Sequence, residues 1–235
     1  MRKLPALGAI ALLLACSPPK KNDHAAPATK SETTQVPQPP SAPAVPVATE
    51  APAGSYTLDK AHGSLIFRVN HIGFSHYTAQ FTEFDAKLDI DPKDPAKASL
   101  TATVNPRSLA LPTPPKGFLD ELLGKQWLDT SAFAQITFKS TRVELTGPDT
   151  ARITGDLSLH GVTLPVTLDA RFNAGYAGNQ YDPAARMGFS AHGSLNRSGF
   201  GIFYGIPAPG STMGVSDNVD VIIETEFNGP PLKSR

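Results

Sequence analysis

The sequence VTLPVTLDARF at residues 162–172 decides the fold prediction, because apolar and polar side chains alternate along nearly all of it. Every even-numbered position from Val162 to Phe172 is apolar, and the positions between them are polar except Pro165. Successive side chains of an extended chain point to opposite faces, so the even positions share one face. The stretch therefore predicts a β-strand with one buried and one solvated face.

The same alternation recurs along residues 54–229. Turn-forming pairs, such as Asp91-Pro92 and His160-Gly161, separate the alternating segments. The other predicted strands are 65–71, 77–81, 84–90, 98–104, 136–145, 152–159, 187–195 and 219–227. Many half-buried strands without helical crossovers are typical of a sandwich or a closed antiparallel barrel. Composition does not decide between a filled and a hollow interior.

One segment departs from the alternation and has helical spacing. Its apolar residues Leu119, Leu122, Leu123 and Trp127 fit a period of 3.6. We expect a short helix over 118–128 that ends near Asp129. The predicted fold is all-β, with about eight strands and one short inserted helix.

The net charge of the 235-residue chain is zero, but this total is a sum over unlike segments. Residues 1–53 have a net charge of +2, residues 54–229 of −4, and residues 230–235 of +2. Binding to nucleic acid depends on a concentration of Lys and Arg that neutralises phosphates. The mildly acidic segment 54–229 therefore argues against a nucleic-acid partner.

The first fifteen residues have the pattern of an export signal. Arg2 and Lys3 precede an apolar run that is too short to span a membrane. The run ends in Leu14-Ala15-Cys16, which resembles a bacterial lipobox, and Cys16 is the only cysteine. We expect residues 1–15 to be a lipoprotein signal peptide and Cys16 to be lipidated. An ordinary signal peptide with an incidental cysteine is the alternative. The resemblance implies a periplasm-facing lipoprotein of the bacterial cell envelope, and Ser17 favours the outer membrane.

Residues 16–53 have the composition of a tether. This segment has nine of the chain's 23 prolines and no aromatic residue. Such a sequence cannot bury enough apolar surface to offset its loss of conformational entropy. We expect a disordered, Pro/Ala-rich linker over 16–53, a folded domain over 54–229 and a short tail over 230–235.

The predicted domain resembles the YceI-like family of periplasmic polyisoprenoid-binding proteins. The matching stretches cover nearly all of 55–228, while Ala134 and Gly199 depart from the family pattern. The stretches are Tyr56–Ser64, Phe67–Ser75, Trp127–Asp129, Phe133–Ser140, Ile153–Val166, Leu195–Gly201 and Val215–Val219. The resemblance implies a lipocalin-like barrel around a long apolar channel. It also implies that a prenyl chain, such as the tail of a quinone or another isoprenoid lipid, occupies this channel.

On this resemblance, apolar residues of the strands are the candidates for the channel lining. Individually they are equally consistent with an ordinary hydrophobic core. The candidates are Phe67, Val69, Phe81, Phe84, Leu88, Leu100, Phe138, Leu157, Leu159, Phe172, Phe189 and Phe203. His71 and Arg197 are the candidate polar contacts near a channel mouth. We expect no cofactor other than a bound lipid.

The chain is predicted not to be an enzyme. Its closest match to a nucleophile elbow, Gly188-Phe-Ser-Ala-His192, lacks the final glycine. Two other functions remain open at this point. A metal- or haem-associated stress protein could use His71 and His76, which flank a turn. A structural envelope module would have a barrel filled with side chains. The sequence does not indicate an oligomeric state.

Overall fold

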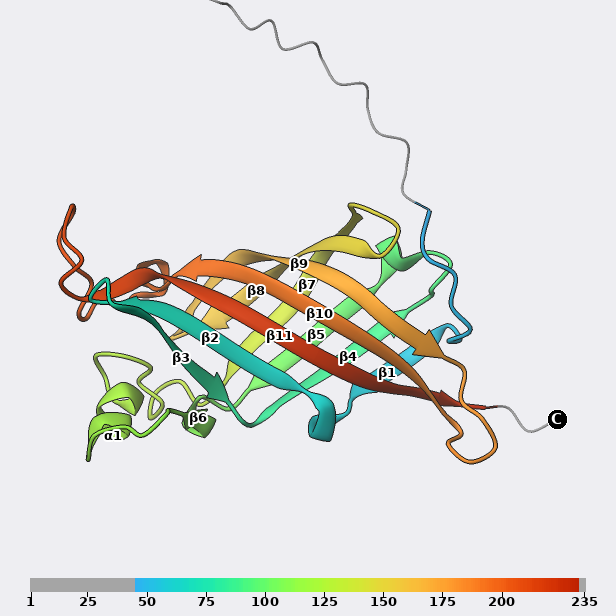
Figure 1. Ribbon diagram of the computed structural model, residues 1–235, viewed down its shortest axis with the longest axis horizontal. Coiled ribbons are helices and arrows are strands. Elements are labelled where there is room, and N and C mark those ends of the chain that lie inside the picture. Colours follow the sequence, from blue (N-terminus) through green and yellow to red (C-terminus); the bar gives the residue numbers. More distant parts are fainter. Residues whose placement is uncertain (1–44, 233–235) are drawn as a thin grey trace, which may run out of the picture. The chain divides into compact units, whose positions relative to one another are not determined.

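The computed structural model describes residues 45–232, and eleven strands among them form one antiparallel sheet (Figure 1). The signal peptide, Cys16 and residues 16–44 of the expected tether lie outside the described residues. The strands are β1 (Gly54–Leu58), β2 (Ser64–His71), β3 (Ser75–Phe81), β4 (Phe84–Ile90), β5 (Ser99–Val104), β6 (Leu109–Ala110), β7 (Ile136–Leu145), β8 (Thr150–Leu159), β9 (Val162–Tyr176), β10 (Ala184–Asn196) and β11 (Val215–Pro231).

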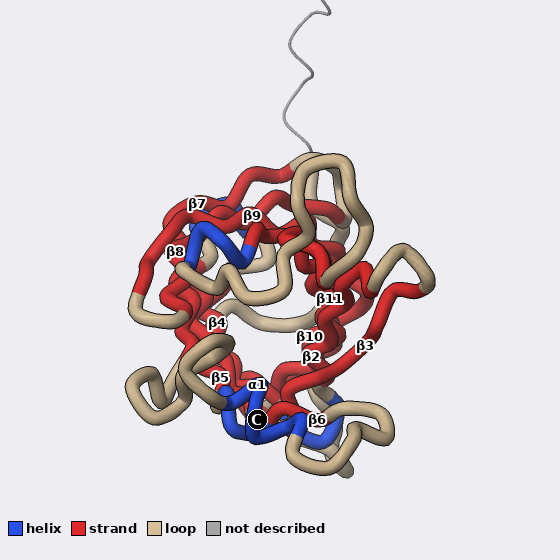
Figure 2. The backbone as a smooth tube through the Cα atoms, turned by 90° about the vertical axis from the view of Figure 1, so that its left-hand side faces the viewer, coloured by secondary structure: helices blue, strands red, loops and turns tan. Residues whose placement is uncertain are grey.

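Eight of these strands close into a barrel. Neighbours pair in the order β1-β4-β5-β7-β8-β9-β10-β11, and β11 pairs back to β1 through Thr57 with Asn228 and Leu58 with Phe227. The ring is visible in Figure 2, which faces one end of the barrel. The predicted antiparallel barrel of about eight strands is therefore confirmed. Closure leaves no free edge strand in the ring.

The remaining three strands extend one end of the ring. The first half of β11 pairs with β2 from Val215 to Glu224, and β2 continues into β3 and β6. The single α-helix of the described residues, α1 (Phe118–Leu123), also lies at this end (Figures 1 and 2). The short 3-10 helices are η1 (Lys60–His62), η2 (Pro95–Lys97), η3 (Pro106–Ser108) and η4 (Arg197–Phe200). We call this end, with the β2–β3 turn, α1 and the loop between η4 and β11, the rim.

Each of the nine predicted strand segments corresponds to a strand, but the sequence analysis missed β1 and β6. The predicted helix is also shorter than expected, because it ends at Leu123 instead of near Asp129. Gly124 has an extended backbone, with φ −81° and ψ 179°. Beyond it the N–H groups of Leu128 and Thr130 donate to Leu122 and Leu123 in irregular turns. Glycine is a poor helix former, so the helix stops there despite the continuing apolar spacing.

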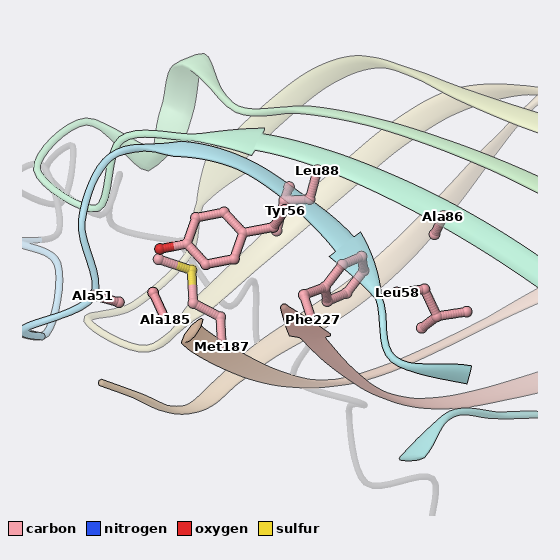
Figure 3. Packing of buried hydrophobic residues seen from close by; sticks show 8 residues of the cluster. All are labelled: Ala51, Tyr56, Leu58, Ala86, Leu88, Ala185, Met187 and Phe227. Carbon is pink, nitrogen blue, oxygen red and sulfur yellow. The ribbon is translucent and has the colours of Figure 1, made fainter. Parts of the chain in front are cut away.

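The opposite end of the ring, which we call the base, is tightly packed. Figure 3 shows Tyr56, Ala185, Met187 and Phe227 directed toward one another from β1, β10 and β11. Tyr56 is fully buried, and its hydroxyl donates a hydrogen bond of 2.6 Å to the carbonyl of Pro52. This cluster packs the β1, β10 and β11 side of the base like a conventional protein core.

Residues 45–53, which the sequence analysis assigned to the tether, contact the barrel. The N–H of Val47 donates to the carbonyl of Pro148 at 2.9 Å, and Thr49 Oγ1 donates to the carbonyl of Gly175 at 3.1 Å. Ala51 is buried in the base cluster. Only Pro46 and Pro52 lack an N–H group in this part of the segment, so the residues between them can donate backbone hydrogen bonds to a neighbouring surface. No helix among residues 45–232 is both long and apolar enough to cross a membrane.

Candidate functional site

The barrel encloses a cavity of about 910 Å³. Its wall is made of the inward-facing side chains of the strands, and it extends from the rim to the segment 45–49. Small-molecule pockets are commonly about 300–1,000 Å³, so this cavity is at the upper end of that range. The interior is therefore hollow, and the structure contradicts the hypothesis of a barrel filled with side chains.

The structure places eleven of the twelve candidate lining residues on the cavity wall. They are Phe67, Val69, Phe81, Phe84, Leu88, Leu100, Phe138, Leu157, Leu159, Phe172 and Phe189. The exception is Phe203, whose side chain is 65% exposed and does not line the cavity. Phe203 follows η4 in an irregular loop, where alternation along a strand no longer determines which way a side chain points. The prediction for Phe203 is therefore wrong.

Sequence reasoning missed two groups of wall residues. The first group has small or aliphatic side chains on the inner face of the strands, such as Ala170, Ala191 and Val221. Their alternation was recognised, so the signal was present, but the choice favoured large side chains. The second group comes from loops at the rim and includes Trp127 and Tyr204. No periodicity marks loop residues, and only the tertiary structure identifies them.

Polar side chains are concentrated at the two ends of the cavity. His71, Glu121 and Tyr204 are at the rim, while Thr49 and Asp149 are at the other end. Between them the wall is apolar except for Thr225, whose hydroxyl donates to the carbonyl of Phe189. The cavity therefore suits a long apolar molecule with its polar group near an end.

Arg197 lies on the wall, as predicted, but it makes different contacts from those expected. Its side chain is buried, and it donates from Nε to the carbonyl of Ser216 and from Nη2 to that of Val215, at 3.0 and 2.9 Å. Nη1 donates to the carbonyls of Ile202 and Tyr204, at 3.1 and 2.8 Å. Burial lowers the pKa of the guanidinium, although Asp217 partly opposes this effect. Four of the five N–H groups of an arginine are thus bound to backbone. Arg197 fixes the loop between η4 and β11 and is not a free contact for a ligand.

His71 lies on the cavity wall, with its ring centroid 6.4 Å from that of Tyr77. In the β2–β3 hairpin, His71 is opposite Ser75 and His76 is opposite Asn70. Residues at successive pairing positions point to opposite faces of the sheet. The two histidines therefore point to opposite faces of the hairpin, which argues against the alternative in which they bind one metal ion.

A different group on the outer surface could in principle hold a metal. Ligand atoms of Asp59, His62 and Glu226 all lie within 4.8 Å of one another. However, Nη1 of Arg186 is 3.1 Å from Oδ2 of Asp59 and 3.8 Å from Oε2 of Glu226. Hydrogen bonds from His62, then from the N–H of Ala61, and also from Arg186 lower the pKa of Asp59 to about 2. A guanidinium already provides the positive charge that a metal ion would bring.

Comparison with known proteins agrees with the barrel fold. A family model described as YceI-like domain matches residues 56–227. The chain belongs to the YceI-like family. The protein YceI of Escherichia coli is 35% identical to it over 181 residues, which are 75% of this chain and 87% of the relative.

Solved structures share the fold of this YceI-like chain. BcnA of Burkholderia cenocepacia superimposes with a TM-score of 0.61 at 23% identity, over 72% of this chain and 98% of BcnA. A domain from Saccharophagus degradans, described as a polyisoprenoid binding domain implicated in plant cell wall breakdown, gives a TM-score of 0.51 at 15% identity. That match covers 74% of this chain and 98% of the other. At these identities the likeness concerns the fold.

Proposed function

We propose that this YceI-like barrel binds the apolar tail of an isoprenoid or quinone-type lipid and carries it without catalysing a reaction. The observation that carries the proposal is the enclosed cavity of about 910 Å³, whose middle section is apolar. Burial of apolar surface contributes about 25 cal/mol per Å². A long hydrocarbon chain can therefore bind here with few polar contacts.

The distribution of polar groups supports an elongated amphiphile. Side chains that can form hydrogen bonds are at the ends of the cavity, with His71 and Tyr204 at the rim. A lipid head group would remain there while the tail extends toward the base. The fold shared with the Saccharophagus degradans domain, described as polyisoprenoid binding, is consistent with such an occupant.

A non-catalytic role fits the polar groups near the cavity. The buried guanidinium of Arg197 is bound to four backbone carbonyls, and Asp149 pairs with Arg171 at 2.8 Å. Neither is arranged as a nucleophile and base within hydrogen-bonding reach of each other.

We further propose that the protein acts in the cell envelope, facing the periplasm and tethered to the outer membrane through Cys16. The support is the export signal pattern of residues 1–15 and the lipobox-like sequence that ends at Cys16. Several acyl chains on one cysteine would give far firmer anchoring than a single chain.

The experiment for binding is native mass spectrometry of the full chain, expressed in a bacterial host and purified in mild detergent. We expect a bound species whose mass and extracted lipid identify a prenyl chain. Barrels that are repeatedly empty, or that hold only straight-chain phospholipid, would overturn the proposal.

The anchor is tested separately by labelling cells with radioactive palmitate. The wild-type chain is expected to incorporate the label, and Cys16→Ser to lose both the label and the membrane fractionation. A Cys16→Ser chain that fractionates like the wild type contradicts the anchor and leaves the binding proposal standing.

A further inference from the structure

The rim of the barrel has exposed apolar side chains at the tips of its loops. Phe74 is 87% exposed in the β2–β3 turn, and Phe203, Tyr204 and Met213 are 65%, 47% and 75% exposed in the loop between η4 and β11. These four are half of the large exposed apolar side chains among residues 45–232, and Tyr181 is the one aromatic residue among the rest. An exposed apolar cluster of this kind marks an interaction surface.

The two loops that carry these residues are bound to each other. The N–H of Ile72, in the β2–β3 turn, donates to the carbonyl of Gly214 in the other loop at 2.9 Å. The two ends of that second loop are joined by the N–H of Val215, which donates to the carbonyl of Gly205 at 2.8 Å. Tyr204 packs against Trp127 with ring centroids 5.5 Å apart. The exposed tips are therefore held in place, so they would lose little conformational entropy when they contact a partner.

The cluster lies at the opening of the cavity. Ile72 and Tyr204 line the cavity wall, and their near neighbours Phe74 and Phe203 point outward from the same two loops. Figure 1 shows these loops at the end of the barrel away from the segment 45–53, which is drawn in blue. A surface that adjoins the opening would be the first part of the protein to meet an incoming ligand.

The chemistry of this surface fits a lipid bilayer. Residues 203–214 read FYGIPAPGSTMG, and neither these twelve residues nor residues 72–75 include Asp, Glu, Lys or Arg. Aromatic side chains favour the boundary between head groups and hydrocarbon, while charged side chains oppose entry. We propose that the rim residues Phe74, Phe203, Tyr204 and Met213 dock into the surface of a bilayer, so that a lipid passes between membrane and cavity without crossing water. This inference rests on the proposed lipid-binding function.

The chain that precedes the described residues is long enough to allow this orientation. The segment 45–53, drawn in blue, is at the end of the barrel opposite the rim (Figure 1), and 28 residues lie between Cys16 and Val45. In a polyproline conformation they would reach about 85 Å at 3.1 Å per residue. The 17 residues of β11 extend ~55 Å at 3.3 Å per residue, which is shorter than this linker. A chain anchored at Cys16 could therefore place its rim against the membrane that holds the anchor.

Quenching of tryptophan by brominated phosphatidylcholine tests the docking in the full chain. F74W places an indole at the rim, and Y181W places one at a matched position, 88% exposed, in the loop between β9 and β10. Trp127 is present in both variants, and its emission in the wild type is subtracted. With vesicles of neutral lipid we expect the F74W indole to shift to shorter wavelength and to lose most of its emission, independently of salt. The Y181W indole should keep its emission.

Equal quenching of the two indoles, or none, would overturn the docking proposal. Loss of a dimer on replacing Phe74 by serine, without any quenching, would also overturn it and show a second copy as the occupant. Native mass spectrometry of the same preparations separates this from the lipid-binding proposal. A bound prenyl lipid without quenching rejects the docking proposal and leaves the lipid-binding proposal standing. Quenching by the vesicles with a cavity that is always empty rejects the lipid-binding proposal and leaves docking standing.

Discussion

The guanidinium carbon of Arg197 lies 5.0 Å from the ring centroid of Trp127. This contact joins the segment after α1 to the start of η4. The same guanidinium donates to the carbonyls of Ile202 and Tyr204 in the loop after η4, and to those of the first two residues of β11. A single buried cation therefore holds together the parts of the rim that surround the opening of the cavity.

Replacing Arg197 is expected to lower the free energy of unfolding. Arg197→Lys keeps the charge, but a lysine ammonium cannot donate to all four of these carbonyls. We therefore expect the free energy of unfolding to fall by about 2 kcal/mol. Arg197→Met removes every donor and should cost more. Urea unfolding measures both variants. The control is Arg142→Met, in an exposed ion pair with Glu144, which should cost about 0.5 kcal/mol or less. An Arg197→Lys protein as stable as the wild type would contradict this role.

Filling the cavity should abolish lipid binding and leave the free energy of unfolding almost unchanged. Ala191 of β10 faces the cavity, so Ala191→Phe adds a ring to open space and should change the free energy of unfolding by less than about 1 kcal/mol. The bound lipid seen by native mass spectrometry should disappear. Ala185 of the same strand is fully buried in the base, and Ala185→Phe should cost about 1–3 kcal/mol through overpacking. Two variants with equal losses of stability would mean that the cavity wall is packed like the base.

Acid should weaken the fold through Asp59. Its pKa is lowered from 3.8 to about 2, so the folded state holds the carboxylate in its charged form. A depressed pKa gives stability that is fully present above pH 3.8 and is lost as the pH falls toward 2. The urea midpoint of the wild type should fall across this window. Asp59→Asn should show a smaller fall there and a lower midpoint at neutral pH. Parallel curves for the two proteins would reject the assignment.

A methyl group at Gly229 should destabilise the base. The backbone of Gly229 lies against the ring of Tyr56, and a Cβ built there would overlap the ring carbons. Since Tyr56 is fully buried, its ring has no free space to enter, and we expect Gly229→Ala to cost about 1–3 kcal/mol. Gly188→Ala is the control, because its Cβ would be 3.8 Å from the nearest atom. Thermal unfolding compares the two, and a Gly229→Ala protein as stable as Gly188→Ala would disprove the close packing.

The strands were predictable because their signal is local. Alternation from Val162 to Phe172 follows from the geometry of one extended chain, so it needs no knowledge of partners. β1 was missed because five residues with few inward positions give too little pattern. The end of α1 was misplaced because the conformation at Gly124 outweighed the apolar spacing that continues to Trp127.

The cavity was predictable only in part. Sequence pattern identified which side chains share the inner face, and eleven of the twelve candidates line the cavity. Alternation could not place Phe203 in its loop, nor show that the donors of Arg197 are taken by backbone carbonyls far along the chain.

The sequence by itself determined nine of the eleven strands, most of the inner face and the resemblance to the YceI-like family, because each rests on neighbouring residues or on short motifs. Only the tertiary structure decided that β11 closes the ring onto β1, that a buried cluster packs around Tyr56 in the base and that the interior is hollow. Those properties depend on whether side chains from opposite walls meet, which is set by barrel diameter and strand register.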